Sequence, residues 1–417
     1  MAKHRMHKRG AALFGALALG AIMPAPAQAQ TRDLNVKLDC GAKGDGAADD
    51  TNKIQDCINR SAASGQAVYL PTGAYRITDQ LRVANHNTTI YGNSSATTTI
   101  VQANGTAHIF HVSNDGNPID KIQFRNLELV YSTPNPSGFG ILCNNCWRTY
   151  FQQLNIGRAA TNAFMGTGIW VTGGNQVFLQ DSVISQTTQQ GAYFANVGDV
   201  FLSDVEVNQP DASGTSVGVV FDTGVGGIYA TNVNVTGGHT GFLFQNTQKK
   251  VPPNFGFFTN CLADTLNGVG WNFQAAQSMR LTNSWSATAA VYGIQVKDAD
   301  GLSITDSRIY NNGADGIFVE PGARNLTIKD STITGNSRGA PRRHFGINIA
   351  AGVSDFQIMN NMIGQADGFA NSQAYGIYIA PGVTDNYMIL GNEYRRNLAG
   401  GLENGATGAN KVVANNL

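Results

Sequence analysis

One unit of this sequence reads Leu302-Ser-Ile-Thr-Asp306-Ser-Arg-Ile309 and, after a short gap, Gly316-Ile-Phe-Val319. The next unit reads Leu326-Thr-Ile-Lys-Asp330-Ser-Thr-Ile333 and then Gly346-Ile-Asn-Ile349. Both units alternate apolar and polar side chains, which is the period of a β-strand, and neither has the spacing of a helix. Each unit therefore predicts short strands separated by turns.

The unit recurs along most of the chain. Its corner residue, which follows the first strand, is Asn or Asp in nine of eleven copies, and the steps between corners are 23 to 31 residues. Such a period with strand-like units indicates a β-solenoid, in which coils stack about 4.8 Å apart and bury their inward side chains against one another. The eleven corners are Asn126, Gln153, Asp181, Asp204, Asn232, Asn260, Asn283, Asp306, Asp330, Asn360 and Gly391.

The corner carboxylates are poor catalytic candidates. Asn and Asp side chains bond to nearby backbone and tolerate tight bends, so every coil needs such a residue whatever the protein does. We interpret Asp181, Asp204, Asp306 and Asp330 as structural for this reason.

Composition narrows the function classes. The chain has 417 residues, of which 49 are Gly and only 13% are charged, which favours a folded, turn-rich protein over a disordered or coiled-coil one. Lys and Arg together number 28, and so do Asp and Glu. No basic excess indicates a nucleic acid or an anionic membrane surface as a partner.

The first 29 residues are interpreted as a signal peptide. Basic residues precede an apolar run from Ala11 to Met23, and Ala27-Gln28-Ala29 is the small-x-small pattern of a cleavage site. No later apolar run is long enough to span a membrane. We expect a secreted or periplasmic protein, mildly acidic after cleavage, with residues 30–417 forming a single domain whose regular coils run from 120 to 410.

Five cysteines in an exported chain leave at least one without an intrachain partner. Cys40 and Cys57 flank the first predicted turn and helix and could pair. Cys143 and Cys146 could pair locally or stay reduced, and Cys261 is expected as a small buried hydrophobic residue.

A helix is expected to cap the solenoid. Asp49-Asp50-Thr51 offers N-caps, while Ile54, Cys57, Ile58 and Ala62 form an apolar stripe that ends at Gly65. Such a cap would cover the apolar core and the unpaired strand edge of the first coil. Asp45, Asp49 and Asp50 could alternatively bind calcium, but three carboxylates are few for that ion, and we expect no cofactor.

Residues 34–78 carry a resemblance to a known family, through Asp39-Cys-Gly-Ala-Lys-Gly-Asp45-Gly46, Asp49-Asp50-Thr51 and Val68-Tyr-Leu-Pro71-Thr-Gly73-Ala-Tyr75-Arg-Ile77. This stretch resembles the opening of the pectate lyase superfamily. That superfamily includes rhamnogalacturonase-like, epimerase-like and glycosyl hydrolase family 28-related polygalacturonase-like proteins and phage tailspikes. The resemblance implies an all-β, right-handed parallel β-helix, here of about eleven or more coils. One fold hosts many chemistries, so it implies no particular reaction.

The catalytic motifs of polygalacturonase-like enzymes are not matched. The nearest sequences are Ala314-Asp315-Gly316, Gly238-His239-Thr240 and Thr327-Ile328-Lys329, in another order and without paired aspartates. The tyrosine–histidine signature expected of an alginate epimerase is missing as well.

The resemblance implies a substrate groove beside the strand that begins Gly-apolar-x-apolar, with reactive groups in the turn before it. Asp211, His239 and Asp264 fall in such turns on successive coils. Stacking would place the two carboxylates about 9 to 10 Å apart, near the separation of an inverting hydrolase.

A second cluster combines Asp315 with Arg342, Arg343 and His344 of the next coil. An arginine can clamp a uronate carboxylate, and Asp or His can act as a base. This set suits β-elimination. Solvated loop residues without a catalytic role remain the alternative for both clusters.

The outward position of the Gly-apolar-x-apolar strand is often aromatic. Its members include Trp170, Tyr193, Phe318 and Tyr378. Outward rings can stack on sugars, or they can form a contact between subunits of a trimer. We therefore expect a monomer or a homotrimer.

These observations predict an exported carbohydrate-active protein. It would cleave a polysaccharide, with uronate-containing chains favoured, by β-elimination or glycosidic hydrolysis. Two alternatives stay open, a non-catalytic tailspike-like or adhesin-like carbohydrate binder and a polysaccharide C5-epimerase.

Overall fold

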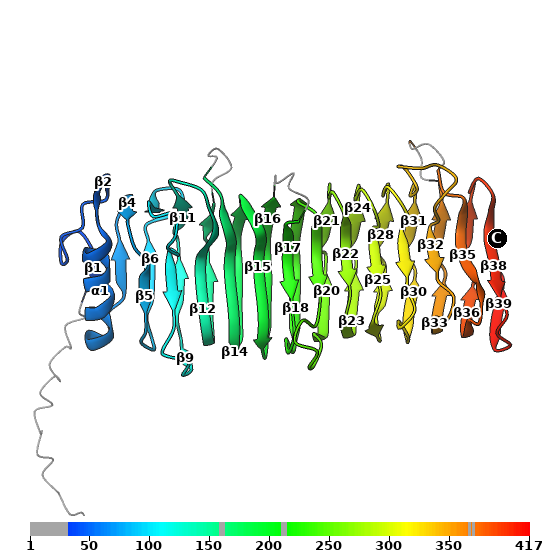
Figure 1. The fold of residues 1–417 in the computed structure, drawn as a ribbon, viewed down its shortest axis with the longest axis horizontal. Helices are drawn as coiled ribbons and strands as arrows, with labels where there is room; N and C mark the ends of the chain where they lie inside the picture. The colour runs from blue at the N-terminus through cyan, green and yellow to red at the C-terminus, as the bar shows by residue number, and fades with distance from the viewer. Residues whose placement is uncertain (1–31, 158–162, 210–214, 366–367, 369–371) are drawn as a thin grey trace, which may run out of the picture. The chain divides into compact units, whose positions relative to one another are not determined.

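The computed structural model describes residues 32–157, 163–209, 215–365, 368 and 372–417. The predicted signal peptide lies outside the described residues. From Asp33 onward the chain forms one compact unit. It is a parallel β-solenoid of about 13 turns with 56% strand and a single helix near its start, which confirms the fold class predicted from the repeats. Figure 1 shows the coils following one another in chain order.

Three faces run the length of the solenoid. Face A holds the Gly-apolar-x-apolar strands, which pair in parallel from each coil to the next. Its strands are β5 (Leu81–Val83), β8 (Phe110–Val112), β12 (Asn135–Gln152), β14 (Met165–Ser185), β15 (Thr187–Val197), β17 (Val217–Phe221), β19 (Thr240–Phe244), β22 (Val269–Phe273), β25 (Ile294–Val296), β29 (Ile317–Val319), β32 (Ile347–Ile349), β35 (Tyr375–Gly382) and β38 (Gly400–Ala406).

Face B precedes the corner residue in each coil, and β12 and β14 bend so that they contribute to it as well. Its other strands are β1 (Leu34–Asn35), β3 (Val68–Leu70), β6 (Thr89–Gly92), β10 (Gln123–Arg125), β16 (Val200–Gln209), β18 (Ile228–Gly237), β20 (Asn254–Thr259), β23 (Ala276–Thr282), β27 (Ser303–Thr305), β30 (Leu326–Lys329), β33 (Ser354–Met359), β36 (Asp385–Leu390) and β39 (Lys411–Ala414).

Face C follows the corner, and the ends of β14, β16 and β18 continue into it. Its own strands are β2 (Asp45–Asp49), β4 (Gly73–Ile77), β7 (Thr98–Gln102), β11 (Glu128–Tyr131), β13 (Asn155–Ile156), β21 (Leu262–Asp264), β24 (Trp285–Ala287), β28 (Arg308–Tyr310), β31 (Thr332–Thr334), β34 (Met362–Gly364) and β37 (Glu393–Arg395). Two short strands, β9 (Ile119–Asp120) and β26 (Ala299–Asp300), pair beside face B.

The corners have the predicted conformation. All eleven predicted corner residues have positive φ, between 48° and 66°. That region is open to Gly and, among other residues, most accessible to Asn and Asp, which explains the composition of the corner column. Side chains also bond along the column, because Asn232 donates to Asp204 at 3.0 Å and Asn283 donates to Asn260 at 3.4 Å.

From β12 onward, the glycine in or just before each face A strand is required by packing. Eleven glycines stack in one column, and a Cβ on any of the first ten would lie 2.4 to 2.7 Å from the carbonyl oxygen of the next glycine. Real Cβ contacts are not that short, so the column admits no larger side chain without movement. Its members are Gly140, Gly168, Gly191, Gly218, Gly241, Gly270, Gly293, Gly316, Gly346, Gly376 and Gly401.

Inward side chains form one continuous apolar core. In the central coils it is aromatic, because Phe221 stacks on Phe244 at 5.3 Å and Phe244 stacks on Phe273 at 4.4 Å between ring centroids. All three rings are fully buried. Stacked rings recur outside the core on face B, where Tyr150, Phe178, Phe201, Tyr229 and Phe257 form a column that ends under the guanidinium of Arg280.

Helix α1 (Thr51–Ser64) lies at the start of the solenoid (Figure 1) and ends at Gly65, with φ of 71°, as predicted. Ile54, Cys57 and Ile58 are buried as expected. The fourth predicted member of the stripe, Ala62, is exposed, because the helix turns Ser61 inward instead.

The predicted N-cap works differently from the expectation. Asp50 makes no side-chain cap bond to the helix, because its carboxylate accepts the backbone N–H groups of Lys43 and Gly44 at 2.7 and 2.8 Å. Asp49 accepts the backbone N–H of Thr51 at 3.0 Å. These carboxylates thus fix the entry turn to the helix.

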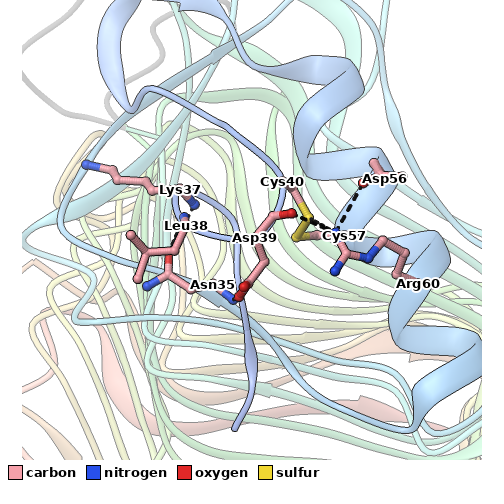
Figure 2. The surroundings of a disulfide bond; sticks show 8 residues. All are labelled: Asn35, Lys37, Leu38, Asp39, Cys40, Asp56, Cys57 and Arg60. Carbon is pink, nitrogen blue, oxygen red and sulfur yellow. Dashed lines mark hydrogen bonds and ion pairs between the residues drawn. A yellow bond between two sulfur atoms is a disulfide. The ribbon is translucent and has the colours of Figure 1, made fainter.

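A disulfide ties α1 to the entry segment. Cys40 is bonded to Cys57, and Arg60 donates to the carbonyl oxygen of Asp39 at 2.7 Å beside it (Figure 2). A second disulfide joins Cys143 to Cys146. Cys261 is a buried free thiol, as its position in the repeat predicted. Within the described part of the chain, no helix is long and apolar enough to cross a membrane.

Candidate functional site

The outward residues of face A form one column. Strand pairing joins each to its neighbour on the next coil, in the order Trp170, Tyr193, Val220, Leu243, Asn272, Gln295, Phe318, Asn348 and Tyr378. We call this the outward column. A second column, the flanking column, contains the residue that precedes each glycine of these strands. Its later members are Thr240, Val269, Tyr292, Asp315, Phe345 and Tyr375.

The first predicted cluster is not assembled along either column. Asp264 belongs to β21 of face C, where it pairs with Thr236 and Ala287. His239 lies beside Gly268, just before face A begins. Asp211 lies outside the described residues. The expectation that His239 and Asp264 are vertical neighbours is therefore wrong, because Asp264 lies at the end of a face C strand, whereas His239 lies at the start of face A.

The second cluster does come together, around Asp315. This carboxylate is only 2% exposed and lies in the flanking column. One of its oxygens accepts the backbone N–H of Phe345 at 2.7 Å, and the other accepts the amide of Asn348 at 2.9 Å. A buried carboxylate is stabilised by such bonds, so Asp315 is held rigidly between two coils.

His344 lies over this carboxylate. Its Nδ1 is 3.6 Å from Asp315 Oδ1, and its side chain is 35% exposed. The backbone N–H of His344 donates to the hydroxyl of the buried Ser337 at 3.1 Å, and its carbonyl accepts from Ala374 at 2.8 Å. The imidazole thus has one nitrogen toward a buried negative charge while the ring remains accessible to solvent.

The two arginines of the cluster are solvent-exposed. Arg342 and Arg343 lie in the same turn as His344, and neither forms an ion pair within the described residues. Arg342 has a φ of 70° and donates its backbone N–H to Ser372 at 2.8 Å. Both guanidinium groups are therefore available to a ligand beside His344.

Tyr292 completes the cluster and was missed by the sequence reasoning. It precedes Asp315 in the flanking column, and its ring centroid lies 5.0 Å from that of Phe318. Burial raises the pKa of Tyr292, and the charges of Asp315 and Glu320 raise that pKa further. Tyr292 is thus a protonated hydroxyl at neutral pH. Tyr292 carries no motif of its own. It could have been identified only from the stacking of the three successive coils that contain residues 292, 315 and 344.

Polar groups continue the site along the outward column. Gln295 donates to Glu320 at 2.6 Å, and Lys297, exposed, lies on the same face as Glu320. Asn272, one coil earlier, has a buried side-chain oxygen without a hydrogen-bond partner. A ligand lying along face A would meet Gln295 and Glu320 close to Tyr292 and His344.

The aromatic side chains that were predicted to stack on sugars pack against other aromatic rings of the protein. Trp170 stacks on Tyr193 at 3.8 Å, and Tyr378 stacks on Phe345 at 4.3 Å. Phe318 packs on Tyr292. Each of these rings thus packs against a neighbouring ring, so they do not form a row of separate platforms for sugars.

Two histidines, which belong to neither of the clusters described above, lie on face A in coils nearer the N-terminus. His108 stacks on Phe139 at 4.7 Å and accepts its backbone N–H at 3.3 Å, while His111 bonds to the amide of Asn144 at 3.1 Å. Burial lowers the pKa of both imidazoles. These histidines are therefore neutral and hydrogen-bonded at pH 7.

Asp222 is a buried carboxylate that organises the neighbouring turns. It accepts the Tyr193 hydroxyl at 2.9 Å, the Gln245 amide at 2.9 Å and both the N–H and the hydroxyl of Thr247, at 2.9 and 2.8 Å. Burial alone would raise the pKa of Asp222, but these bonds and that from Thr223 outweigh burial and lower it. We assign this residue a structural role.

The Asp222→Asn variant is expected to lose about 2 to 3 kcal/mol of stability at pH 7, since a charged acceptor of several buried bonds is removed. Because the folded-state pKa lies below the unfolded one, the ionic contribution is present above about pH 4 and disappears as the pH falls through the folded value. Urea unfolding at pH 7 and pH 3 should show the gap to wild type narrowing in acid. Asp181→Asn, at an exposed corner that suits Asn, is the matched control, and an equal effect of both would contradict the assignment.

Among the residues that the structure describes, no group of three or more His, Cys, Asp or Glu side chains could hold a metal ion. The acidic entry residues bond to protein instead, since Asp45 accepts the N–H groups of Ala47 and Ala48.

Comparisons with known proteins agree with this architecture. Residues 34–200 match the family model "Rhamnogalacturonase A/epimerase, pectate lyase-like", and residues 167–363 match "Right handed beta helix region". The chain is therefore a right-handed parallel β-helix with a pectate lyase-like domain, as its opening residues implied. The match to the rhamnogalacturonase A/epimerase model covers the N-terminal part of the solenoid.

Individual relatives are distant. The A-module of mannuronan C-5 epimerase AlgE6 from Azotobacter vinelandii superimposes with a TM-score of 0.59 at 18% identity, over 92% of this chain and 99% of that one. Tailspike protein 3 of bacteriophage CBA120 gives 0.69 at 14% identity, over 92% and 61%. A stretch of 46 residues is 59% identical to mannuronan C5-epimerase AlgE3 of A. vinelandii, covering 11% of this chain. The chain matches about 2% of the length of that relative.

Proposed function

We propose that the protein acts on a uronate-containing polysaccharide lying along face A, by removing the proton from C5 of one uronate. The observation that carries the proposal is the position of the buried Asp315 carboxylate between Tyr292 and His344 of the adjacent coils. Two coil steps separate Tyr292 from His344, about 9 to 10 Å along the axis, which leaves room for a sugar ring between them.

The chemistry follows from these groups. Arg343 would neutralise the uronate carboxylate, which makes the C5 proton more acidic. His344, with Asp315 at its Nδ1, would accept that proton through its other nitrogen. The C5–H electron pair then forms the C4–C5 double bond, the C4–O bond breaks, and the Tyr292 hydroxyl donates a proton to the leaving oxygen. The product is a shortened chain with an unsaturated uronate end.

A C5-epimerase is the second candidate. The same proton is removed, but the chain stays intact and a proton returns to C5 from the opposite side. Two proton-handling groups on either side of the substrate favour this reaction, and a protonated Tyr292 opposite His344 supplies them. The 46-residue match to a mannuronan C5-epimerase supports it as well.

Incubating the protein with polymannuronate, polygalacturonate and a neutral glucan in D₂O tests the proposal. Absorbance from unsaturated ends is expected for elimination, and deuterium at C5 of an intact chain is expected for epimerisation. New reducing ends without unsaturation would indicate hydrolysis and overturn the proposal. Binding without any of these changes would instead favour the adhesin-like alternative.

We also propose that the chain is exported, with residues 1–29 removed. The Cys40–Cys57 and Cys143–Cys146 disulfides support this, since such bonds persist in oxidising compartments. A polysaccharide substrate outside the cytoplasm fits that location.

A further inference from the structure

A groove of about 440 Å³ lies at the corner between faces B and C, away from the face A strands. It crosses the coils of β18, β21, β24 and β28, about 14 Å along the solenoid axis. Its principal lining residues are Asn260, Asn283, Leu262, Trp285, Asp306 and Arg308.

The centre of the groove is an aromatic and cationic pair. Arg308 follows Trp285 in the strand register, and its guanidinium carbon lies 5.8 Å from the Trp285 ring and 5.0 Å from the ring of Tyr310. Arg308 is exposed and forms no ion pair with any residue the structure describes. Its charge is held in place by the two rings but is not neutralised.

The rim of the groove supplies amide and carboxylate groups. The corner amides of Asn232, Asn260 and Asn283 each donate one bond to the preceding corner, so a second N–H remains on each. Asp306 ends this row as an exposed acceptor. The indole N–H of Trp285 is buried and has no hydrogen-bond partner in the described chain. One hydrogen-bond donor of a residue that lines the groove is therefore left unpaired.

We infer that this groove is a second, non-catalytic binding site for the uronate polysaccharide proposed above as the substrate. The Trp285 ring, which lines the groove and packs on Tyr310 at 5.2 Å, suits an apolar contact with a pyranose, the corner groups suit its hydroxyls, and Arg308 suits its carboxylate. The inference rests on the proposed function for the identity of the polymer. The site would hold a distal part of the polymer and raise the affinity for long chains.

Calorimetry with defined oligogalacturonate and oligomannuronate, and with a neutral gluco-oligosaccharide of equal length, tests the inference. The titrations use the His344→Gln protein, in which turnover does not interfere. Two binding events are expected with one of the two acidic oligomers. Trp285→Ala and Arg308→Gln should each weaken one event about tenfold or more and leave the other unchanged.

Arg280→Gln is the matched control, since Arg280 also lies over an aromatic ring, Phe257 at 6.0 Å, but outside the groove. Arg308 is exposed, so its variant keeps the fold even if Trp285→Ala is destabilised, and urea midpoints check this. Equal binding by wild type, Arg308→Gln and Arg280→Gln would overturn the inference, and so would preference for the neutral oligomer.

Turnover of short and long chains separates this inference from the proposed function. In the otherwise unmodified protein, Arg308→Gln is expected to raise KM for the polymer and to leave kcat on a trimer unchanged. If the wild type binds the oligomer in the groove but shows no turnover, the proposed function is contradicted and the inferred second binding site is supported.

Discussion

His344→Gln is expected to lower kcat on the uronate polymer by about 10²- to 10⁴-fold, which is the usual contribution of a positioned general base. Gln is close to His in size and polarity, so the turn that Ser337 holds should remain folded. The imidazole is accessible, whereas Asp315 beneath it is buried. The loss should therefore appear in turnover and leave the unfolding free energy nearly unchanged.

Initial rates of C5-proton loss, by unsaturated-end absorbance or by deuterium incorporation, measure this effect. His86→Gln is the matched control, because His86 is an exposed histidine that accepts a backbone N–H at 3.1 Å and lies just after β5, many coils before His344. His239→Gln distinguishes the two clusters considered from the sequence. Loss of turnover in His239→Gln with full turnover in His344→Gln would move the active site away from Asp315.

The fold could be predicted because each coil repeats the same physical requirements. The corner needs positive φ, so Asn and Asp recur there and mark the period directly. Stacking one coil on the next then converts equal positions in the repeat into columns, which is why Trp170, Tyr193, Phe318 and Tyr378 do share one register. Such columns depend only on strand period and not on turn conformation.

The candidate site could be predicted only in part, because the turns before the face A glycines vary in length and the sequence does not show which residues of different turns align. Asp315 and His344 lie within a few residues of a face A glycine, so their columns could be estimated from the sequence. Asp264 lies further from the next glycine and turned out to belong to face C. Tyr292 and Asp222 were missed because neither carries a motif, and their roles depend on partners one coil away, Asp315 and Tyr193.

The N-cap of α1 also could be predicted only in part. The sequence places an N-cap candidate at Asp50 correctly at the helix start. The carboxylate nevertheless serves Lys43 and Gly44, because the entry turn leaves two backbone donors closer to it than the first turn of α1. Local propensity identified the boundary, and the tertiary path of the chain decided the hydrogen bonds.

Gly218→Ala is expected to destabilise the protein by about 2 to 4 kcal/mol, although the same change in an unstrained strand normally stabilises slightly. The added Cβ would lie 2.3 Å from Val235 Cγ1 and 2.7 Å from the carbonyl oxygen of Gly241. Val235 is fully buried in the core, and the carbonyl belongs to the next coil. Neither can retreat without moving a strand ladder that is shared with its neighbours on both sides.

Gly105→Ala separates this packing effect from the general effect of replacing glycine. Its φ is not positive, and an added Cβ would meet Pro134 O at 3.5 Å and Thr133 Oγ1 at 3.6 Å, both ordinary contacts. Its free energy of unfolding is expected to stay within about 0.5 kcal/mol of wild type. Equal stability of the two variants in urea unfolding would mean that adjacent coils can separate locally at little cost. The glycine column would then reflect something other than close stacking, and the repeated Gly-apolar-x-apolar pattern would lose its physical explanation.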